Sequence, residues 1–395
     1  MSYSFDEIID RKKYNSLKWN KFFYKETFKT DNDLIPLWIA DMDFKVSPGI
    51  QKRIYKIVEH GIYGYCGLDS EYYEAIISWY EKIHNWKISK EEICFTPGIV
   101  PAISYLLEAF SNKKDSIMLF TPVYYPFKES INKMERIAVE CPLLKDDNNF
   151  YTIDYNNMKN LIINNNVKIL IFCSPHNPIG RVWKEEELNK IADICLKYNI
   201  LIISDEIHSD IIFSEHKHIP FLNLNHKIIN NCVVCNAVGK TFNLAGLKVS
   251  NIIIKNEILR NKYLKILDKY GINYPNTFAI ECVKGAYLDS YDWYYQMLNY
   301  LKNNLDFLEY FIKKELPKVK FFKQEGTYLA WLDFSNYNFS KDQLKIFFEE
   351  KVKIAVDYGF WFGKEGENFI RLNLACPKSI LITVLEKIKK ESNFL

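Results

Sequence analysis

Three short apolar runs, at 169–173, 200–203 and 232–235, constrain the fold of this chain more than any other feature. Each has the length and unbroken apolar character of a parallel strand that is buried on both faces. An amphipathic helix is expected over 185–198, between the first two runs, because three glutamates in its first turn suit a helix N-terminus. The order strand, helix, strand predicts a βαβ unit, and therefore an α/β fold with a mainly parallel sheet.

A lysine follows the third of these runs. The apolar segment 232–235 is broken at Gly239, and Lys240 comes next, just past the carboxyl end of an expected buried strand. An ammonium group in such a place loses contact with water, which lowers its pKa and makes it a nucleophilic amine. The alternative is a solvated lysine in a surface loop, which the residues at the ends of the other two runs argue against.

The run 200–203 ends in a carboxylate, Asp205, followed by Glu206. A carboxylate at the mouth of a buried strand costs several kcal/mol unless a cation or hydrogen-bond donors meet it. At an effective dielectric constant near 20, a cation about 3 Å away returns roughly 5 kcal/mol. That energy is sufficient to hold a proton on a heterocyclic nitrogen.

Three motifs in this order, SPHNPIG (174–180), SDEIH (204–208) and GKTFNLAGLK (239–248), resemble the pyridoxal 5'-phosphate (PLP) site of fold-type I enzymes, the class I/II aminotransferase-like group. Each motif follows a strand, at the end where open α/β sheets bind ligands. The resemblance implies a large domain whose mainly parallel sheet is covered by helices, plus a smaller α+β domain at the C-terminus. The expected division is an N-terminal arm and part of the small domain in 1–47, the large PLP-binding domain in 48–285 and the small domain in 286–395.

The same resemblance implies roles for individual residues. Lys240 would bind the aldehyde of PLP, Asp205 would pair with the pyridinium nitrogen, and Asn177 would hydrogen-bond the phenolic oxygen. Tyr124 matches the aromatic residue that stacks on the pyridine ring and joins the catalytic residues. Tyr125 is the alternative, and a packing role stays open for both.

The cofactor phosphate is expected at the turn after 93–96, where a helix begins. Gly98, Ile99 and Val100 would offer backbone N–H groups and the positive end of the helix dipole. By resemblance, Lys248 is the basic residue that grips the phosphate. The family usually has serine before the catalytic lysine, so Thr241 and backbone groups would have to replace that contact.

A second copy of the chain is implied as a partner. The segment around 61–67 matches a family segment whose tyrosine contacts the cofactor phosphate of the partner subunit. Tyr63 is at the matching position, and Tyr65 is the alternative. The resemblance therefore implies a homodimer.

Two segments are expected to bind the substrate. Arg371 lies inside an apolar strand expected at 368–377, where its fork suits a carboxylate, and it matches the residue that binds the substrate α-carboxylate. A structural ion pair is the alternative. The strand-like segment 35–47 resembles a stretch that lies over the active site, with its backbone near Ala40 meeting the substrate carboxylate and Asn177 close by. An edge strand with solvated acids is the other interpretation.

From residue 35 to 385 the chain resembles one branch, the MalY/PatB-type C–S β-lyases, which include cystathionine β-lyases; the likeness rests on phrases such as WIADMDF, TPVYYPF, SPHNPIGRVW and EGTYLAWLDF. His208 is typical of that branch, since aminotransferases usually have tyrosine there, and it is counted among the cofactor contacts. The branch implies α,β-elimination of L-cystathionine or another cysteine S-conjugate to thiol, pyruvate and ammonia. A PLP-dependent aminotransferase of small amino acids and a regulatory protein acting through protein contact are the alternatives.

Charge and composition exclude other classes. The net charge of +3 over 395 residues, with both signs interspersed, leaves no basic surface for nucleic acid. No apolar run approaches the ~20 residues of a membrane span, and the N-terminus has no signal-peptide core. Nine cysteines indicate reduced thiols and a cytoplasmic protein. Cys232 and Cys235 are expected to pack in the core, and His216 and His218 in a solvated turn, so no metal site is expected.

Overall fold

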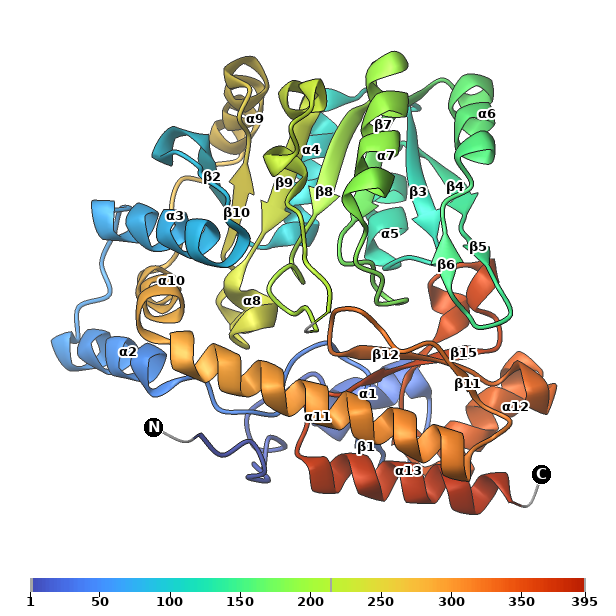
Figure 1. The fold of residues 1–395 in the computed structure, drawn as a ribbon. Coiled ribbons are helices and arrows are strands. Elements are labelled where there is room, and N and C mark those ends of the chain that lie inside the picture. Colours follow the sequence, from blue (N-terminus) through green and yellow to red (C-terminus); the bar gives the residue numbers. More distant parts are fainter. Residues whose placement is uncertain (1–2, 214, 394–395) are drawn as a thin grey trace.

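A seven-stranded sheet forms the centre of the computed structural model, which describes residues 3–213 and 215–393 (Figure 1). The strand order is β2-β10-β9-β8-β7-β3-β4. The bounds are β2 Ile93–Thr96, β10 Ser250–Ile253, β9 Cys232–Asn236, β8 Leu201–Asp205, β7 Val167–Cys173, β3 Ser116–Thr121 and β4 Ile137–Pro142. Strand β10 runs antiparallel to both of its neighbours, β2 and β9, and the other neighbouring pairs of this sheet are parallel. The prediction of an α/β fold with a mainly parallel sheet is confirmed.

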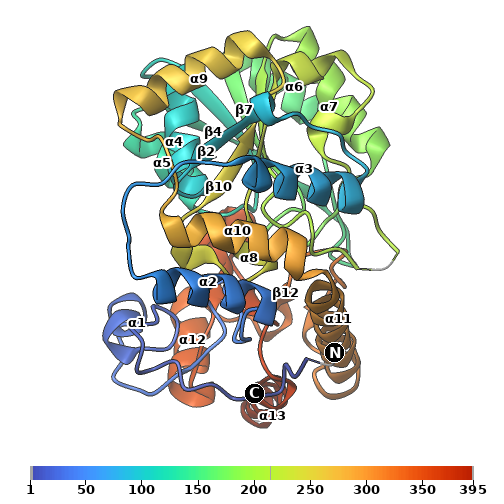
Figure 2. The same ribbon diagram turned by 90° about the vertical axis from the view of Figure 1, so that its left-hand side faces the viewer.

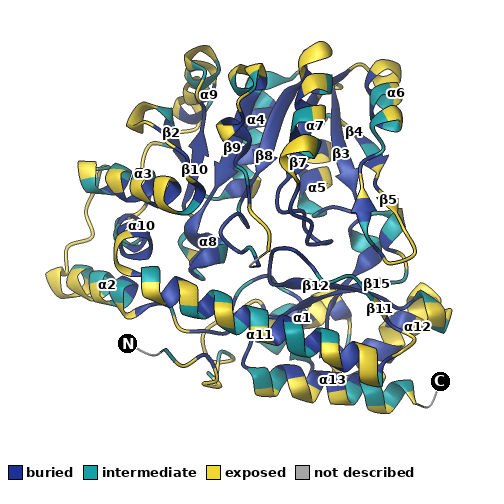
Figure 3. Cartoon of the chain, viewed as in Figure 1, coloured by how far each residue is buried: buried dark blue, intermediate teal, exposed yellow. Residues whose placement is uncertain are grey.

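Both faces of this sheet are buried, which explains the unbroken apolar runs in the sequence. In β7, Leu170 and Phe172 belong to one core cluster, while Ile169 and Ile171 belong to another. Successive side chains of a strand point to opposite faces, so the two clusters lie on the two sides of the sheet. The central strands are accordingly buried along their length (Figure 3).

Helices cover each face. One face carries α4 (Ile99–Phe110), α5 (Pro126–Lys133) and α9 (Glu257–Lys269), and the other carries α6 (Tyr155–Asn165) and α7 (Glu185–Lys197) (Figure 2). Helix α7 begins with three glutamates, as expected from the dipole. Its connection of β7 to β8 gives the predicted βαβ unit.

A second, four-stranded sheet lies beyond the carboxyl ends of the parallel strands (Figure 1). Its order is β11-β12-β15-β14, and all its pairs are antiparallel. The strands and the helices nearby are β11 Lys320–Phe321, β12 Leu329–Asp333, β14 Asp357–Tyr358, β15 Phe369–Asn373, α11 Tyr291–Glu315, α12 Lys341–Lys345, the π-helix Ile346–Val352 and α13 Lys378–Ser392. This α+β part agrees with the expected fold, while the residue limits of the domains stay a prediction.

The N-terminal part joins both regions. It contains α1 (Lys21–Phe28) and β1 (Ile35–Pro36), which pairs in parallel with β13 (Ile354–Ala355). The strand expected over 35–47 is thus only two residues long. The rest continues with irregular backbone into α2 (Pro48–His60). It is held by single backbone bonds, from Asn373 N–H to Leu37 O and from Asp43 N–H to Ala375 O, and by side chains such as Asn243.

The remaining regular elements are two longer helices, α3 and α10, and several short segments. They are α3 Ser70–His84, α8 Val238–Thr241, α10 Thr277–Asp289, the paired strands β5 Leu144–Lys145 and β6 Tyr151–Thr152, and 3-10 turns at Lys90–Glu92, Phe221–Asn223, Lys227–Asn231, Ala245–Leu247, Ser335–Tyr337, Gly359–Trp361 and Lys364–Gly366. Among the described residues no helix is both long and apolar enough to cross a membrane.

The cysteines and the histidines of the loop at 216–218 test two smaller predictions. All nine cysteines are free, and Cys232 and Cys235 are buried in strand β9, as expected for core packing. The solvated turn predicted for His218 is wrong, because this ring is buried and its Nε2 lies 2.9 Å from Glu206 Oε2. The buried carboxylate next to Asp205 needs that partner.

One buried arginine joins the two sheet regions. Arg181 is fully buried, its Nε donates to Glu325 Oε2 at 3.0 Å, and its Nη2 donates to Glu187 Oε2 at 2.9 Å. Glu325 also accepts from the backbone N–H of Val182 at 2.7 Å. These bonds tie the loop after β7 to the segment before β12.

Replacing Arg181 by methionine should lower the free energy of unfolding by about 3 kcal/mol or more, because it leaves Glu325 buried without its cation. Urea unfolding followed by circular dichroism measures this loss. The control is Lys341→Ala, which removes an exposed pair with Glu367 and should cost less than about 1 kcal/mol. Equal losses in the two variants would contradict this role of Arg181.

Candidate active site

Three neighbouring parallel strands end at one edge of the large sheet and bring the expected site residues together. The register aligns Cys173 of β7 with Asp205 of β8, and Asp205 with Cys235 of β9. Asn177, Asp205 and Lys240 therefore follow strands at the same edge, which faces the four-stranded sheet (Figure 1). This is the edge at which open α/β sheets bind ligands.

Asp205 is a buried carboxylate with little compensation from the chain. Its Oδ1 accepts from the backbone N–H of Ile207 at 3.1 Å, and burial raises its pKa to about 7. The positive charge of Lys240 opposes that rise only in part. A cation held against this carboxylate would restore its ionised form.

Lys240 lies on the single-turn helix α8, directly after β9. Its Nζ donates to the backbone carbonyl oxygen of Ala40 at 2.6 Å. Burial, assisted by the positive charge of Arg371, lowers its pKa to about 8. At pH 7 roughly a tenth of this amine is uncharged, far more than for an ordinary lysine, as the sequence predicts for a nucleophile.

Arg371 on β15 comes from the small sheet to the same place. Its Nη1 donates to Asn177 Oδ1 at 2.9 Å, and its Nη2 donates to the backbone oxygen of Trp38 at 3.1 Å. It also forms an ion pair with the buried Asp357, whose pKa burial raises to about 6. The ion pair that was the alternative for Arg371 thus exists, and the same guanidinium lies beside Asn177.

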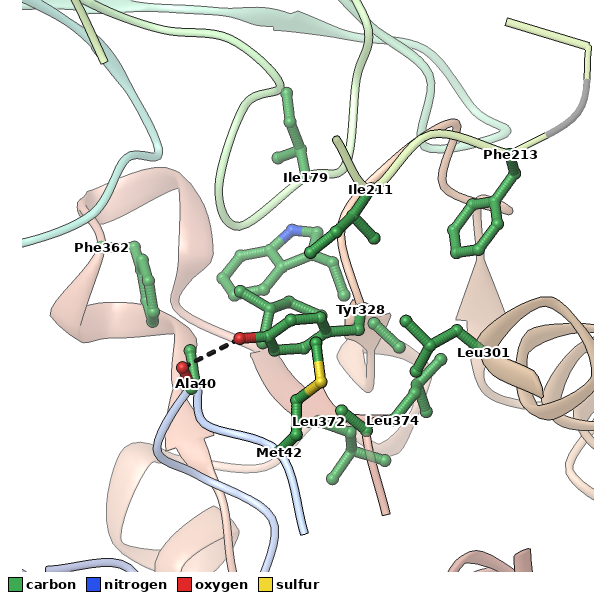
Figure 4. Packing of buried hydrophobic residues seen from close by; sticks show 14 of the residues in the cluster. Ala40, Met42, Ile179, Ile211, Phe213, Leu301, Tyr328, Phe362, Leu372 and Leu374 are labelled. Atoms are coloured by element: carbon green, nitrogen blue, oxygen red, sulfur yellow. Dashed lines mark hydrogen bonds between the residues drawn. The ribbon is translucent and has the colours of Figure 1, made fainter. Parts of the chain in front are cut away.

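The segment 38–44 passes between the two sheet regions. The hydroxyl of Tyr328 donates to the oxygen of Ala40 at 3.0 Å, as Figure 4 shows, so this carbonyl receives both Tyr328 and Lys240. The amide of Asn373 donates to the carbonyl oxygens of Ile39 and Asp41. The backbone around Ala40 is therefore fixed by side chains from the site itself.

The expected phosphate site is the start of α4. Gly98 precedes the helix with a φ of 104°, and no side chain caps the helix. The nearest atom that a Cβ at Gly98 would meet is 3.8 Å away, so glycine is needed there for its backbone conformation rather than for space. The N–H groups of Ile99 and Val100 lie in the first turn, where helices bind anions.

Two side chains assigned to the phosphate, Thr241 and Lys248, differ in their surroundings. The Thr241 hydroxyl donates to Asp210 Oδ2 at 2.7 Å, in the core, so the hydroxyl contact expected from Thr241 goes to a carboxylate. Lys248 is exposed in a left-handed turn at φ 53°. In the single chain Lys248 is therefore exposed to solvent.

Tyr124 and His208 lie within the site. The backbone N–H of Tyr124 donates to the oxygen of Asn177 at 3.2 Å. The buried His208 ring packs edge-on against Tyr328, 5.9 Å between centroids, and burial holds its pKa well below the usual value, so it is neutral. Tyr63, by contrast, is exposed in the loop between α2 and α3, beside Phe278.

The residues present fit PLP. The ring nitrogen of that group is cationic when protonated, and Asp205 is a buried carboxylate whose own chain leaves it mostly uncompensated. Among the described side chains, His208 Nδ1 and Arg371 Nε are buried polar atoms without a partner. The uncapped α4 suits a phosphate, and Lys240 suits an aldehyde.

Four residues that build the site were not predicted. They are Asp357, Tyr328, Asn243 and Asn373. Asn373 had a usable signal, since it lies two residues after Arg371 on one strand and therefore on the same face. The other three depend on contacts with distant segments, for which a single sequence carries no pattern.

Comparisons with known proteins agree with this geometry. Residues 35–388 match the family model described as aminotransferase class I and II. The chain is 37% identical to cystathionine beta-lyase PatB of Bacillus subtilis, over 98% of this chain and 99% of that protein. It is 30% identical to protein MalY of Escherichia coli, over 96% of each. The crystal structure of cystalysin from Treponema denticola, which contains a pyridoxal 5'-phosphate cofactor, superposes with a TM-score of 0.95, at 36% identity over 100% of both chains.

The cofactor-free protein should become relatively less stable as the pH rises, because of Asp205. Its folded pKa of about 7 lies above the unfolded value of 3.8, so the folded state resists ionisation between these values. The contribution of the Asp205 carboxyl to the free energy of unfolding is fully present below pH ~4. It is lost as the pH rises through ~7, by up to about 4 kcal/mol. Asp205→Asn removes this dependence.

Urea unfolding of cofactor-free wild type and Asp205→Asn at pH 5 and pH 8 measures the difference. Relative to the wild type, Asp205→Asn should be more stable at pH 8 than at pH 5. Asp147→Asn, a change at an exposed aspartate, should match the wild type at both values. A gap between wild type and Asp205→Asn that does not change with pH would show that Asp205 ionises freely.

Proposed function

This chain belongs to the family of class I and II aminotransferases and is a PLP-dependent C–S β-lyase of the MalY/PatB type; we propose the following substrate and residue roles for it. The substrate is L-cystathionine or a related cysteine S-conjugate, and the products are a thiol, pyruvate and ammonia. The observation that carries the proposal is the meeting of a buried amine of pKa about 8, Lys240, with the guanidinium of Arg371 and the carboxylate of Asp205 at one sheet edge.

Each residue has a distinct task. PLP, when bound, supplies an electron-poor ring that accepts the electron pair left on Cα after its proton is removed. Asp205 keeps a negative charge at the ring nitrogen, and the neutral His208 adds no charge beside it. Asn177 donates to the phenolic oxygen through its Nδ2, since its Oδ1 is taken by Arg371. Tyr124 stacks on the ring.

Lys240 and Arg371 act on the substrate. Arg371 binds the α-carboxylate, and the backbone near Ala40 lies beside it. Lys240 Nζ takes the Cα proton, which its lowered pKa allows near neutral pH. The Cβ–S bond then breaks with its electron pair leaving on sulfur, and water converts the remaining unsaturated amino acid to pyruvate and ammonia.

The assembly and the location are part of the same proposal. The exposed Tyr63 and its loop support a homodimer in which this tyrosine reaches the partner's cofactor phosphate, near the N-terminus of α4 and the exposed Lys248. Nine free cysteines support a cytoplasmic protein. The division into 1–47, 48–285 and 286–395 is retained for the domains.

The activity is tested by incubating the PLP-loaded protein with L-cystathionine and measuring pyruvate and free thiol together. Equal amounts of both products support β-elimination. A second reaction contains L-alanine and 2-oxoglutarate. Glutamate formed there at a higher rate than pyruvate from cystathionine would identify an aminotransferase instead, and neither product would leave a role through protein contact.

Lys240→Ala should lower the rate of pyruvate formation by roughly 10²–10⁴-fold or more, because the proton acceptor at Cα is lost. The matched control is Lys269→Ala, an exposed lysine of α9 that pairs with Glu108, and its rate should equal that of the wild type. Wild-type activity in Lys240→Ala would show that another group removes the proton.

Arg371→Lys should raise KM for cystathionine by roughly 10- to 100-fold, because an ammonium cannot replace the two-pronged contact of a guanidinium with a carboxylate. Steady-state kinetics of pyruvate release measure the change. Arg136→Lys serves as control, since that side chain bonds to the end of α4. An unchanged KM in Arg371→Lys would assign the residue to its ion pair with Asp357 alone.

A further inference from the structure

A buried carboxylate outside the proposed chemistry, Asp210, is hydrogen-bonded on all sides. Its Oδ1 accepts from His84 Nε2 at 2.8 Å and from Trp79 Nε1 at 3.2 Å, and its Oδ2 accepts from Thr241 Oγ1 at 2.7 Å. The hydroxyl of Tyr294 donates to its backbone oxygen at 2.7 Å. Burial raises the pKa of this carboxyl, but the bonds from His84, Thr241 and Trp79 outweigh burial and keep it below its usual range.

One of these partners is the residue next to Lys240. Helix α8 has four residues, a single turn, and such a turn is not stable by itself. The direction of the Lys240 side chain therefore depends on what holds its neighbours. The bond from Thr241 to Asp210 is the first such anchor after Lys240 in the chain.

The next two residues are anchored as well. The ring of Phe242 packs against Trp79 and Trp293, 5.3 and 6.1 Å between centroids. The amide of Asn243 bonds to the backbone of Met42 and Phe44, in the segment whose Ala40 oxygen receives Lys240. Among the partners that hold residues 241–243, which are Asp210, two tryptophan rings and two backbone carbonyls, only Asp210 carries a charge.

Asp210 also belongs to the loop that carries the ring-binding acid. Asp205 ends β8, and the same short loop continues through His208 to Asp210. Lys240 and Asp205, the two residues proposed to hold the cofactor, are thus connected through the loop 205–210 and the hydrogen bond from Thr241 to Asp210.

We propose that Asp210 is a positioning residue, which through the hydroxyl of Thr241 fixes α8 and sets the place of Lys240 relative to Asp205. This inference rests on the proposed function, since it assumes that Lys240 and Asp205 hold the cofactor. It differs from the assignment of Thr241 to the phosphate, because the hydroxyl acts here through the protein core.

The experiment compares Thr241→Val, Thr241→Ser, Asp210→Asn and the double variant Thr241→Val with Asp210→Asn. Four quantities are measured. They are the rate constant at which cofactor-free protein takes up PLP, followed by visible absorption; kcat and KM for pyruvate release; and the unfolding temperature of the cofactor-free protein. Thr383→Val, an exposed threonine of α13, is the matched control.

Thr241→Val should lower the uptake rate constant and kcat by roughly 10- to 100-fold, the factor for one hydrogen bond to a charged group, with KM changed less than about 2-fold. Thr241→Ser should restore both. Asp210→Asn should show the same pattern. The uptake rate constant and kcat of the double variant should be no lower than those of the less active single variant, because both changes break the same interaction. Thr383→Val should match the wild type.

Three results would overturn the inference. One is wild-type uptake and kcat in Thr241→Val. Another is a defect in Thr241→Val together with normal Asp210→Asn, which would mean that the hydroxyl contacts the cofactor directly. The third is a loss that follows the unfolding temperature and is not restored by serine. If wild-type protein itself neither takes up PLP nor forms pyruvate, the proposed function fails, which is a different outcome.

Discussion

The burial of Asp205 at the end of an apolar strand is the constraint on which the rest of the site depends. The chain offers this carboxylate one backbone N–H and a distant charge, so its ionisation is unfavourable in the protein alone. A protonated ring nitrogen would supply the missing positive charge. Folding stability and cofactor binding are therefore linked through one group, since a ligand that binds only the folded state adds its binding free energy to stability.

The other charged residues are arranged around that carboxylate without neutralising it. Arg371 is paired with Asp357 and bonded to Asn177, and Lys240 is directed to the Ala40 carbonyl. Each cation thus already has a partner within the chain. A substrate carboxylate would give Arg371 a second anionic partner beside Asp357, and the uncharged fraction of Lys240 can react with an aldehyde.

The large sheet and the residues at its edge could be predicted from the sequence because both follow local patterns. Asp205 and Lys240 come directly after apolar runs, and Arg371 stands out inside one. Tyr328 could not be predicted because its partner Ala40 lies 288 residues away in the chain. Asp357 could not be predicted because its partner Arg371, 14 residues later, is brought beside it only by strand pairing. The segment 35–47 looked like a strand because it is largely apolar, but only two of its residues pair in a sheet, and Asp43 bonds to Arg11 and Lys18. Thr241 was assigned by its place beside Lys240, whereas its partner in the core decides where its hydroxyl points.

The site combines residues from both ends of the chain, and this affects its assembly during translation. Ala40 leaves the ribosome early, Lys240 and Asp205 follow, and Arg371 comes close to the carboxyl end. A nascent polypeptide that has reached β10 already contains the amine, the ring-binding acid and the glycine turn of α4, but not the guanidinium. Such an unfinished chain lacks the group that grips an amino-acid carboxylate, so the order of synthesis separates the cofactor-binding residues from the substrate-binding one.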